Sequence, residues 1–311
     1  MKRSFKFKSS DGITDIHCVK WGVEEPKAVL QIAHGMSEFI DRYDDFAKYL
    51  NERGIVVVGN DHIGHGKSIV EDKGPMYFGG NNSWHYVVED LFTVYKKTKE
   101  QYPDVPYFML GFSLGSFLMR SMVINYSDGI DGVILIGTGQ AMPMQAKIAK
   151  LIAKIEKLIH GDKAMTEAID NLTFGAYNKE FRPNRTRMDW LCANEEILDK
   201  FLVDERKGEA FTVGLFRELI NVMIYTRKLE NIEKQDKNLP ILLLSGEDDV
   251  VGDYTKGIKR LHDDYKSVGI KHVEMKFYPG DRHDILNEKD REDVYSDIVK
   301  WTDKVLVKKR K

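Results

Sequence analysis

The sequence predicts an α/β fold, with a mostly parallel central sheet, helices on both faces and a helical cap insertion. Short apolar runs typical of buried parallel strands alternate with amphipathic helical patterns along most of the chain. One of these runs leads directly into a serine flanked by glycines. The alternation stops near residue 138 and resumes near residue 236. We therefore expect a core formed by residues 1–137 and 236–311, and a helical cap or lid formed by residues 138–235.

Strand patterns account for most of the predicted core. Residues 5–12 alternate and then turn, and residues 15–21 are typical of the partner strand in a hairpin. The buried strands are predicted at 27–33, 54–59, 105–110, 132–137, 240–245 and 273–278. The helices between them are predicted at 40–50, 83–100, 116–124 and 254–268, with Ser83 as an N-cap and a last helix that contains Val294 to Val305.

The predicted cap shows helical spacing without a convincing strand. Three helices are expected, over 144–159, near 190–201 and near 211–227. The first is amphipathic and rich in lysine, so it either packs on its own domain or contacts lipid aggregates or a membrane surface. Phe174, Phe211, Leu215 and Phe216 either line an acyl pocket or hold the cap together.

Composition excludes several classes of protein. The 311 residues are 42% apolar and 31% charged, with a net charge of −2, which does not favour a nucleic-acid binder. The start lacks the apolar region of a signal peptide, and no apolar run approaches the roughly 20 residues of a membrane span. We expect a cytoplasmic protein. Cys18 and Cys192 form neither a metal motif nor a redox motif, and we expect no metal and no cofactor.

The most informative motif is Gly111-Phe112-Ser113-Leu114-Gly115. It fits Gly-x-Ser-x-Gly, the pattern that places a serine on a sharp turn between a strand and a helix. Side chains at the two glycines would clash in such a turn. Ser113 is therefore the candidate nucleophile, and its alternative interpretation is a plain helix N-cap.

A serine hydroxyl needs a base, and the base needs an acid to orient it. The order Ser, Asp, His along the chain supplies both. The candidate base is His283, which follows the last strand, and the candidate acid is Asp249, with the adjacent Asp248 as its rival. An oxyanion hole requires two backbone donors. We expect these donors to be the N–H groups of Leu114 and Met36.

Five segments together resemble the monoacylglycerol lipase and lysophospholipase group of the α/β-hydrolase superfamily, also described as serine aminopeptidase-like. They are His34-Gly35-Met36-Ser37-Glu38 with Arg42-Tyr43, then 61–68, 111–115, 246–252 and 283–288. The resemblance implies an α/β-hydrolase fold with a variable cap. The family commonly has Asp-Pro-Val-Gly at the acid, and Asp249-Val250-Val251-Gly252 fits that register, which favours Asp249 over Asp248.

The expected function is hydrolysis of single-chain lipid esters through an acyl-enzyme intermediate. Alternatives on the same triad are a short-chain or aromatic-acid esterase, an amidase or a peptidase. A non-catalytic binding protein with this fold is an alternative of another class. His34 and Asp61 are interpreted as braces of their loops, and Glu38 and Arg42 as an ion pair that braces the oxyanion loop. Acyl length, head group and oligomeric state stay open.

Overall fold

The computed structural model describes residues 1–140 and 142–309. Its centre is a single eight-stranded sheet with the order β1-β2-β4-β3-β5-β6-β7-β8. β1 and β4 each pair antiparallel with β2, and every other neighbouring pair is parallel. The mostly parallel sheet predicted from the sequence is confirmed.

The strands follow the apolar runs of the sequence. Their bounds are β1 (Lys2–Lys8), β2 (Asp15–Trp21), β3 (Ala28–Ala33), β4 (Ile55–Asn60), β5 (Tyr107–Phe112), β6 (Gly132–Ile136), β7 (Ile241–Gly246) and β8 (Val273–Tyr278). The strands from β3 to β7 are buried along their whole length, because layers cover both faces of the sheet. The edge strand β8 has exposed and half-buried residues between its buried ends.

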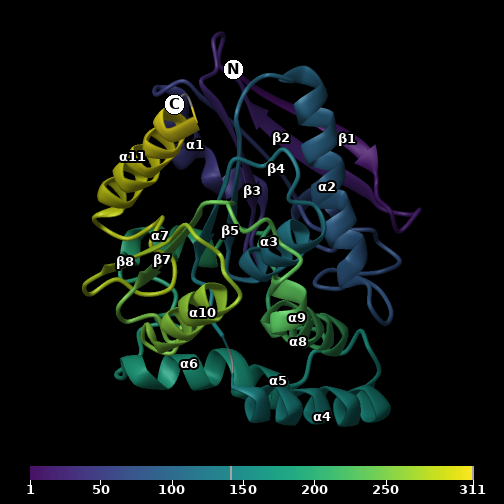
Figure 1. Ribbon diagram of the computed structural model, residues 1–311. Helices are drawn as coiled ribbons and strands as arrows, with labels where there is room; N and C mark the ends of the chain where they lie inside the picture. Colours follow the sequence, from purple (N-terminus) through teal and green to yellow (C-terminus); the bar gives the residue numbers. More distant parts are fainter. Residues whose placement is uncertain (141, 310–311) are drawn as a thin grey trace.

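Helices cover both faces of the sheet, as Figure 1 shows. α1 (Asp44–Asn51) packs against α11 (Arg291–Lys309) on one face, and α2 (Trp84–Gln101) packs against α3 (Leu114–Asn125) on the other. The 3-10 turns η1 (Ile40–Tyr43) and η2 (Gly66–Ser68) flank β4, and α10 (Lys256–Ser267) joins β7 to β8. In the part of the chain that the structure describes, no helix is long and apolar enough to cross a bilayer.

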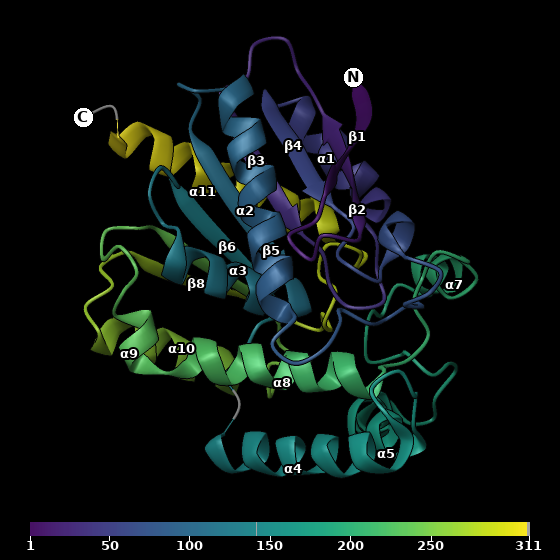
Figure 2. The same ribbon diagram turned by 90° about the vertical axis from the view of Figure 1, so that its right-hand side faces the viewer.

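We call residues 138–235 the cap segment. Its helices are α4 (Pro143–His160), α5 (Glu167–Asp170), α6 (Ala176–Asn178), α7 (Glu195–Leu202), α8 (Val213–Arg227) and α9 (Leu229–Ile232), with a π-helical turn η3 (Asn171–Gly175) and a 3-10 turn η4 (Lys179–Phe181). α4 and α8 lie side by side below the sheet, with α4 outermost (Figure 2). One isolated antiparallel bridge joins Met165 to Thr212.

One local prediction was wrong, and a second is confirmed only in its position. The helix expected near residue 190 begins only at Glu195, because the preceding backbone groups bond elsewhere: Leu191 O accepts from the N–H of Asp284 (2.8 Å) and the N–H of Ala193 donates to Glu288. Ser83 occupies the N-cap position of α2, as predicted, but its side chain makes no capping hydrogen bond. The partners of Leu191 and Ala193 are distant in sequence, so the local sequence could not show that they prevent an earlier helix start.

Candidate active site

Ser113 occupies a strained turn between β5 and α3. Its backbone has φ 51° and ψ −119°, an unfavourable conformation for a residue with a side chain. The flanking glycines allow this turn, because a Cβ at Gly111 would lie 2.6 Å from the carbonyl oxygen of Gly115. A Cβ at Gly115 would overlap the carbonyl oxygens of Ala33 and His34. The predicted elbow is therefore present, with Ser113 at the amino end of α3.

The structure brings His283 together with Asp249. His283 Nδ1 lies 2.9 Å from Asp249 Oδ1, and the two side chains are 1% and 0% exposed. The Asp249 carboxylate is held by the N–H of Val251 (2.9 Å) and the hydroxyl of Ser245 (3.3 Å). Asp248 is exposed and does not contact His283 through a hydrogen bond among the described residues. The geometry thus distinguishes the two aspartates that the sequence left as rivals.

The other ring nitrogen of His283 is available for chemistry. Within residues 1–140 and 142–309, Nε2 is buried and has no hydrogen-bond partner. His283 lines the same pocket as Ser113. With Nδ1 bonded to Asp249, a neutral imidazole presents Nε2 as the proton acceptor, which is the orientation that a general base for serine requires.

The loop after β3 lies beside the serine elbow. Ala33 at the end of β3 pairs in register with Gly111, so the residues that follow Ala33 lie next to the turn. Met36 from this loop lines the pocket that contains Ser113, and Leu114 is the first residue of α3. The first N–H groups of a helix have no partner inside the helix. Met36 and Leu114 both lie beside Ser113, so their N–H groups stay the candidate oxyanion donors.

A buried ion-pair network supports this loop. The Glu38 carboxylate accepts hydrogen bonds from the N–H of Gly35 (2.8 Å) and the hydroxyl of Tyr43 (3.1 Å), and pairs with Arg42. Arg42 Nη2 also lies 2.7 Å from Asp284 Oδ2. Arg42 therefore joins the loop after β3 to the loop that carries His283. The contact to Asp284 was not predicted, since no local pattern connects residues so distant in sequence.

His34 and Asp61 both brace neighbouring loops, as expected. Asp61 accepts from the N–H groups of Ile40 (2.7 Å) and Lys67 (2.8 Å), and burial raises the pKa of its carboxyl to about 6. His34 Nε2 accepts from the N–H of His62 (3.0 Å). In the described ranges, no group of three His, Cys, Asp or Glu side chains is arranged to hold a metal ion.

The pocket that contains Ser113 and His283 is narrow and mostly apolar. Besides these two residues, it is lined by Met36, Glu38, Phe112, Phe174, Met188, Trp190, Leu191 and Phe201. The ring of Trp190 lies 5.3 Å from that of His283. Phe174 is thus a pocket residue, whereas Phe211, Leu215 and Phe216 are buried elsewhere in the cap segment. The sequence did not lead us to assign Met188, Trp190 or Leu191 to the site. Trp190 and Leu191 begin a short apolar run, residues 190–193, that follows Asp189.

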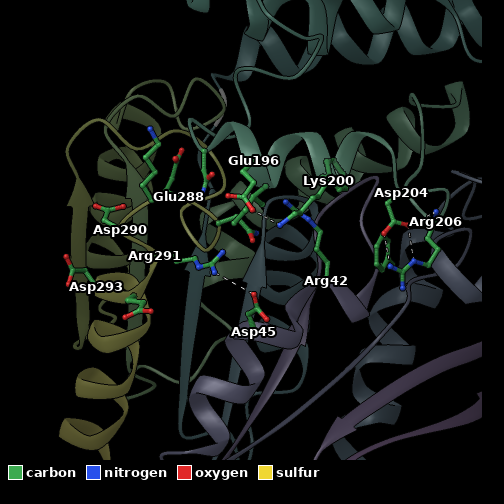
Figure 3. A pocket seen from close by; sticks show the side chains of 17 residues that line it. Arg42, Asp45, Glu196, Lys200, Asp204, Arg206, Glu288, Asp290, Arg291 and Asp293 are labelled. Atoms are coloured by element: carbon green, nitrogen blue, oxygen red, sulfur yellow. Dashed lines mark hydrogen bonds and ion pairs between the residues drawn. The ribbon is translucent and has the colours of Figure 1, made fainter.

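A second, larger pocket is lined mostly by charged side chains, among them Arg42 (Figure 3). Phe201 lines both pockets, and the Arg42 guanidinium stacks on its ring at 4.3 Å. Phe201 is therefore shared by the two pockets, whereas Arg42 lines only the charged one. Neither Ser113 nor His283 lines the charged pocket, so the smaller apolar pocket is the candidate active site.

Comparison with known protein sequences supports a hydrolase. Residues 24–290 match the family described as "Serine aminopeptidase, S33". The "Monoglyceride lipase homolog" of Monkeypox virus is 26% identical and covers 92% of this chain and 93% of its own length. The "Monoglyceride lipase" of Mus musculus is 26% identical over 85% of this chain and 77% of its own length.

Solved structures agree with the sequence comparison. A highly thermostable carboxyl esterase from Bacillus coagulans superimposes with a TM-score of 0.90 at 26% identity, over 98% of this chain and 99% of the esterase. A structure described as "Lipase (Open form)" has a TM-score of 0.85 at 25% identity, over 98% of this chain and 99% of that one. These likenesses extend over the core and the cap segment.

Proposed function

Because the chain belongs to the Serine aminopeptidase S33 family of α/β hydrolases and is a carboxylic ester hydrolase, we propose that it cleaves single-chain lipid esters of the monoacylglycerol or lysophospholipid type. The relatives described as monoglyceride lipases support this substrate class. The cytoplasmic location predicted from the sequence is part of the proposal.

The observation that carries the proposal is the apolar lining of the pocket around Ser113. Methionine, leucine and aromatic side chains from the cap segment and the core surround the serine, which suits an acyl chain. An aminopeptidase instead needs a free carboxylate to bind the substrate ammonium group. Glu38 is the acidic side chain in this lining, and its oxygens are already bonded to Gly35, Tyr43 and Arg42.

In the proposed mechanism, Ser113 Oγ attacks the ester carbonyl carbon while His283 Nε2 takes its proton. Asp249 orients the imidazole and stabilises its positive charge. The N–H groups of Met36 and Leu114 stabilise the oxyanion. The tetrahedral intermediate expels the alcohol, which receives the proton from His283. Water then attacks the acyl-enzyme with His283 as base, releasing the fatty acid and restoring Ser113.

A substrate panel tests the proposed function. Initial rates would be measured with p-nitrophenyl esters from acetate to palmitate, with monoacylglycerols and lysophospholipids, and with aminoacyl p-nitroanilides. We expect turnover of the single-chain lipid esters and little or no release of p-nitroaniline. Activity confined to acetate-length or aromatic esters, or to the anilides, would contradict the lipid proposal while leaving the hydrolase chemistry intact.

The outer face of α4 supports contact between the cap segment and a lipid surface. Ala146 and Ala153 face the protein, whereas apolar side chains at helical spacing are exposed to solvent. The exposed set is Met144, Ile148, Leu151, Ile155, Leu158 and Ile159. Lysines lie along one side of this stripe. An exposed apolar stripe flanked by lysines is typical of helices that lie in the interface of an anionic membrane.

Vesicle binding tests this contact. We expect the protein to sediment with phosphatidylglycerol vesicles and less with phosphatidylcholine vesicles. Replacing Ile148 and Ile155 by serine should reduce sedimentation, while the matched control Ile13→Ser, which changes an exposed isoleucine at the β1–β2 turn, should not. Equal binding by both variants would exclude α4 as the contact.

A further inference from the structure

Arg120 on α3 is a fully buried arginine that the proposed mechanism does not use. It is 1% exposed and is the largest fully buried side chain in the described chain. Among the described residues it forms no ion pair with a carboxylate within 4.0 Å. Burying an arginine without an adjacent counter-ion is costly, so its hydrogen bonds need an explanation.

The Arg120 guanidinium contacts the cap segment near the start and near the end of its sequence. Nη1 donates to the carbonyl oxygen of Gly139 (2.9 Å), and Nη2 donates to Gln140 Oε1 (2.9 Å). Both acceptors follow β6, where the chain enters the cap segment. Nη2 also donates to the carbonyl oxygen of Thr226 (3.0 Å), in the last turn of α8, which is the last long helix before the chain returns to β7.

Burial lowers the pKa of Arg120, and the polar groups around the guanidinium offset part of that cost. The last carbonyl groups of a helix lack partners within the helix and carry partial negative charge, and Thr226 supplies one of them. Gln140 accepts from Arg120 through Oε1, while its Nε2 donates to Asp264 Oδ2 (2.5 Å). The amide therefore links the guanidinium to a carboxylate on α10. The planar guanidinium fork of arginine can donate to all three acceptors in this arrangement. A lysine ammonium group cannot match the geometry of that fork.

Gly139 and Gln140, near the start of the cap segment, also pack against the loop that carries Asp249 and against α10. A Cβ at Gly139 would lie 3.4 Å from the carbonyl oxygen of Val251, and a Cβ at Gly257 would lie 3.2 Å from the backbone nitrogen of Gln140. Arg260 Nε donates to the carbonyl oxygen of Gln140 (3.1 Å). The start of the cap segment is thus held on one side by Arg120 of α3, and on the other side by the loop that carries Asp249 and by α10.

We propose that Arg120 is a positioning residue that fixes the cap segment on the core and thereby determines which acyl chains the pocket accepts. It lies about two helical turns beyond Ser113 and does not line the pocket. Its effect passes through α8. Phe216 of α8 packs against Phe211, and Phe211 packs against the pocket residue Phe174, with ring centroids 5.8 and 5.3 Å apart. This inference rests on the proposed lipid-ester function.

Chain-length selectivity tests the proposal. In Arg120→Met, which removes the fork but keeps an apolar stem, kcat/KM for p-nitrophenyl dodecanoate should fall at least about 10-fold, mainly through KM, corresponding to about 1.4 kcal/mol. The value for p-nitrophenyl acetate should change less than about 2-fold, because Ser113 and its partners stay in place. Arg53→Met, at a half-buried surface arginine, is the control. An equal fall for both esters, or no fall for either, would overturn the proposal.

Two further measurements keep the outcome decisive. Hydrogen exchange in the last turn of α8 should accelerate in Arg120→Met but not in Arg53→Met, and unchanged exchange there would contradict the positioning role. If Arg120→Met does not fold, Gln140→Leu decides the question with the same two esters, since it removes one acceptor and leaves the guanidinium in place. A wild-type protein inactive on dodecanoate would instead refute the proposed function, and the exchange result would still test Arg120.

Discussion

His283 Nδ1 and Asp249 Oδ1 lie 2.9 Å apart in a site from which solvent is almost wholly excluded. Asp248, one residue away, is exposed. The turn after β7 therefore directs one carboxylate toward the histidine and its neighbour toward solvent. Two adjacent aspartates with different environments provide a matched pair for mutation.

The pair gives the first prediction. Asp249→Asn should reduce kcat/KM by about 10³- to 10⁴-fold, because the imidazole loses the partner that fixes its tautomer and stabilises its charge. Asp248→Asn, an exposed change, should alter kcat/KM by less than about 2-fold. Steady-state kinetics on one soluble ester compare the two. Similar losses in both variants would mean that Asp249 is not the acid.

The second prediction concerns the close approach of Gly115 to β3. Gly115→Ala should destabilise the protein by on the order of 3 kcal/mol and reduce activity, since a methyl group would overlap two carbonyl oxygens. Gly80→Ala is the control, because no atom lies within 4 Å of a Cβ at that position. Urea unfolding measures both. A fully stable and active Gly115→Ala protein would show that the elbow is packed differently.

The third prediction concerns Arg42. Arg42→Met should cost about 3–5 kcal/mol of stability, because it leaves Glu38 and Asp284 buried without their cation. Arg206→Met breaks pairs with Asp204 and Asp41 that are more exposed to solvent, and it should cost no more than about 1 kcal/mol. Urea denaturation distinguishes them. Equal costs would mean that the buried network contributes little.

The fourth prediction is an acid-dependent loss of stability. Burial lowers the pKa of His62 to about 3 and of His65 to about 4, from an ordinary value of 6.5, and also lowers the pKa of His34. The unfolded chain therefore binds protons that the folded chain does not. The contribution of these neutral histidines to the free energy of unfolding is fully present above about pH 6.5. It is lost as the pH falls toward their pKa values in the folded protein.

His65→Gln removes one of these protons. The dependence of the unfolding free energy on pH, measured by urea titrations between about pH 7 and pH 5, should become shallower by up to about 1.4 kcal/mol per pH unit. His272→Gln, at an exposed histidine, should leave the slope unchanged. Parallel slopes for wild type and His65→Gln would show that this histidine does not stay neutral in the folded protein.

Much of the core was predictable because its signals are local. The run at residues 105–110 and the two glycines around Ser113 specify a buried strand and a tight turn over a few residues, and β5 and α3 follow them closely. The similarity of residues 249–252 to the family pattern favoured Asp249, and Asp249 is the aspartate that contacts His283. Each of these features depends on a few neighbouring residues of restricted type, so it could be recognised in a single sequence.

Tertiary contacts explain what the sequence did not show. Residues 190–193 do not form the expected helix, because Leu191 and Ala193 bond to the loop that carries His283. Arg120 lies in a sequence segment that predicts a helix, yet its hydrogen-bond acceptors lie up to 106 positions away from it along the chain. The same holds for Arg42 and Asp284. Such partners are defined only once the cap segment is folded onto the core.

The most direct test of the account is covalent labelling of Ser113. The protein would be treated with a fluorophosphonate probe, digested and analysed by mass spectrometry, beside Ser113→Ala. We predict one probe adduct, on the peptide that contains Ser113, formed at the same time as ester hydrolysis is lost. The Ser113→Ala protein should be folded, unlabelled and inactive. An adduct on another residue, or hydrolysis that survives in Ser113→Ala, would contradict the assignment of Ser113 as the nucleophile.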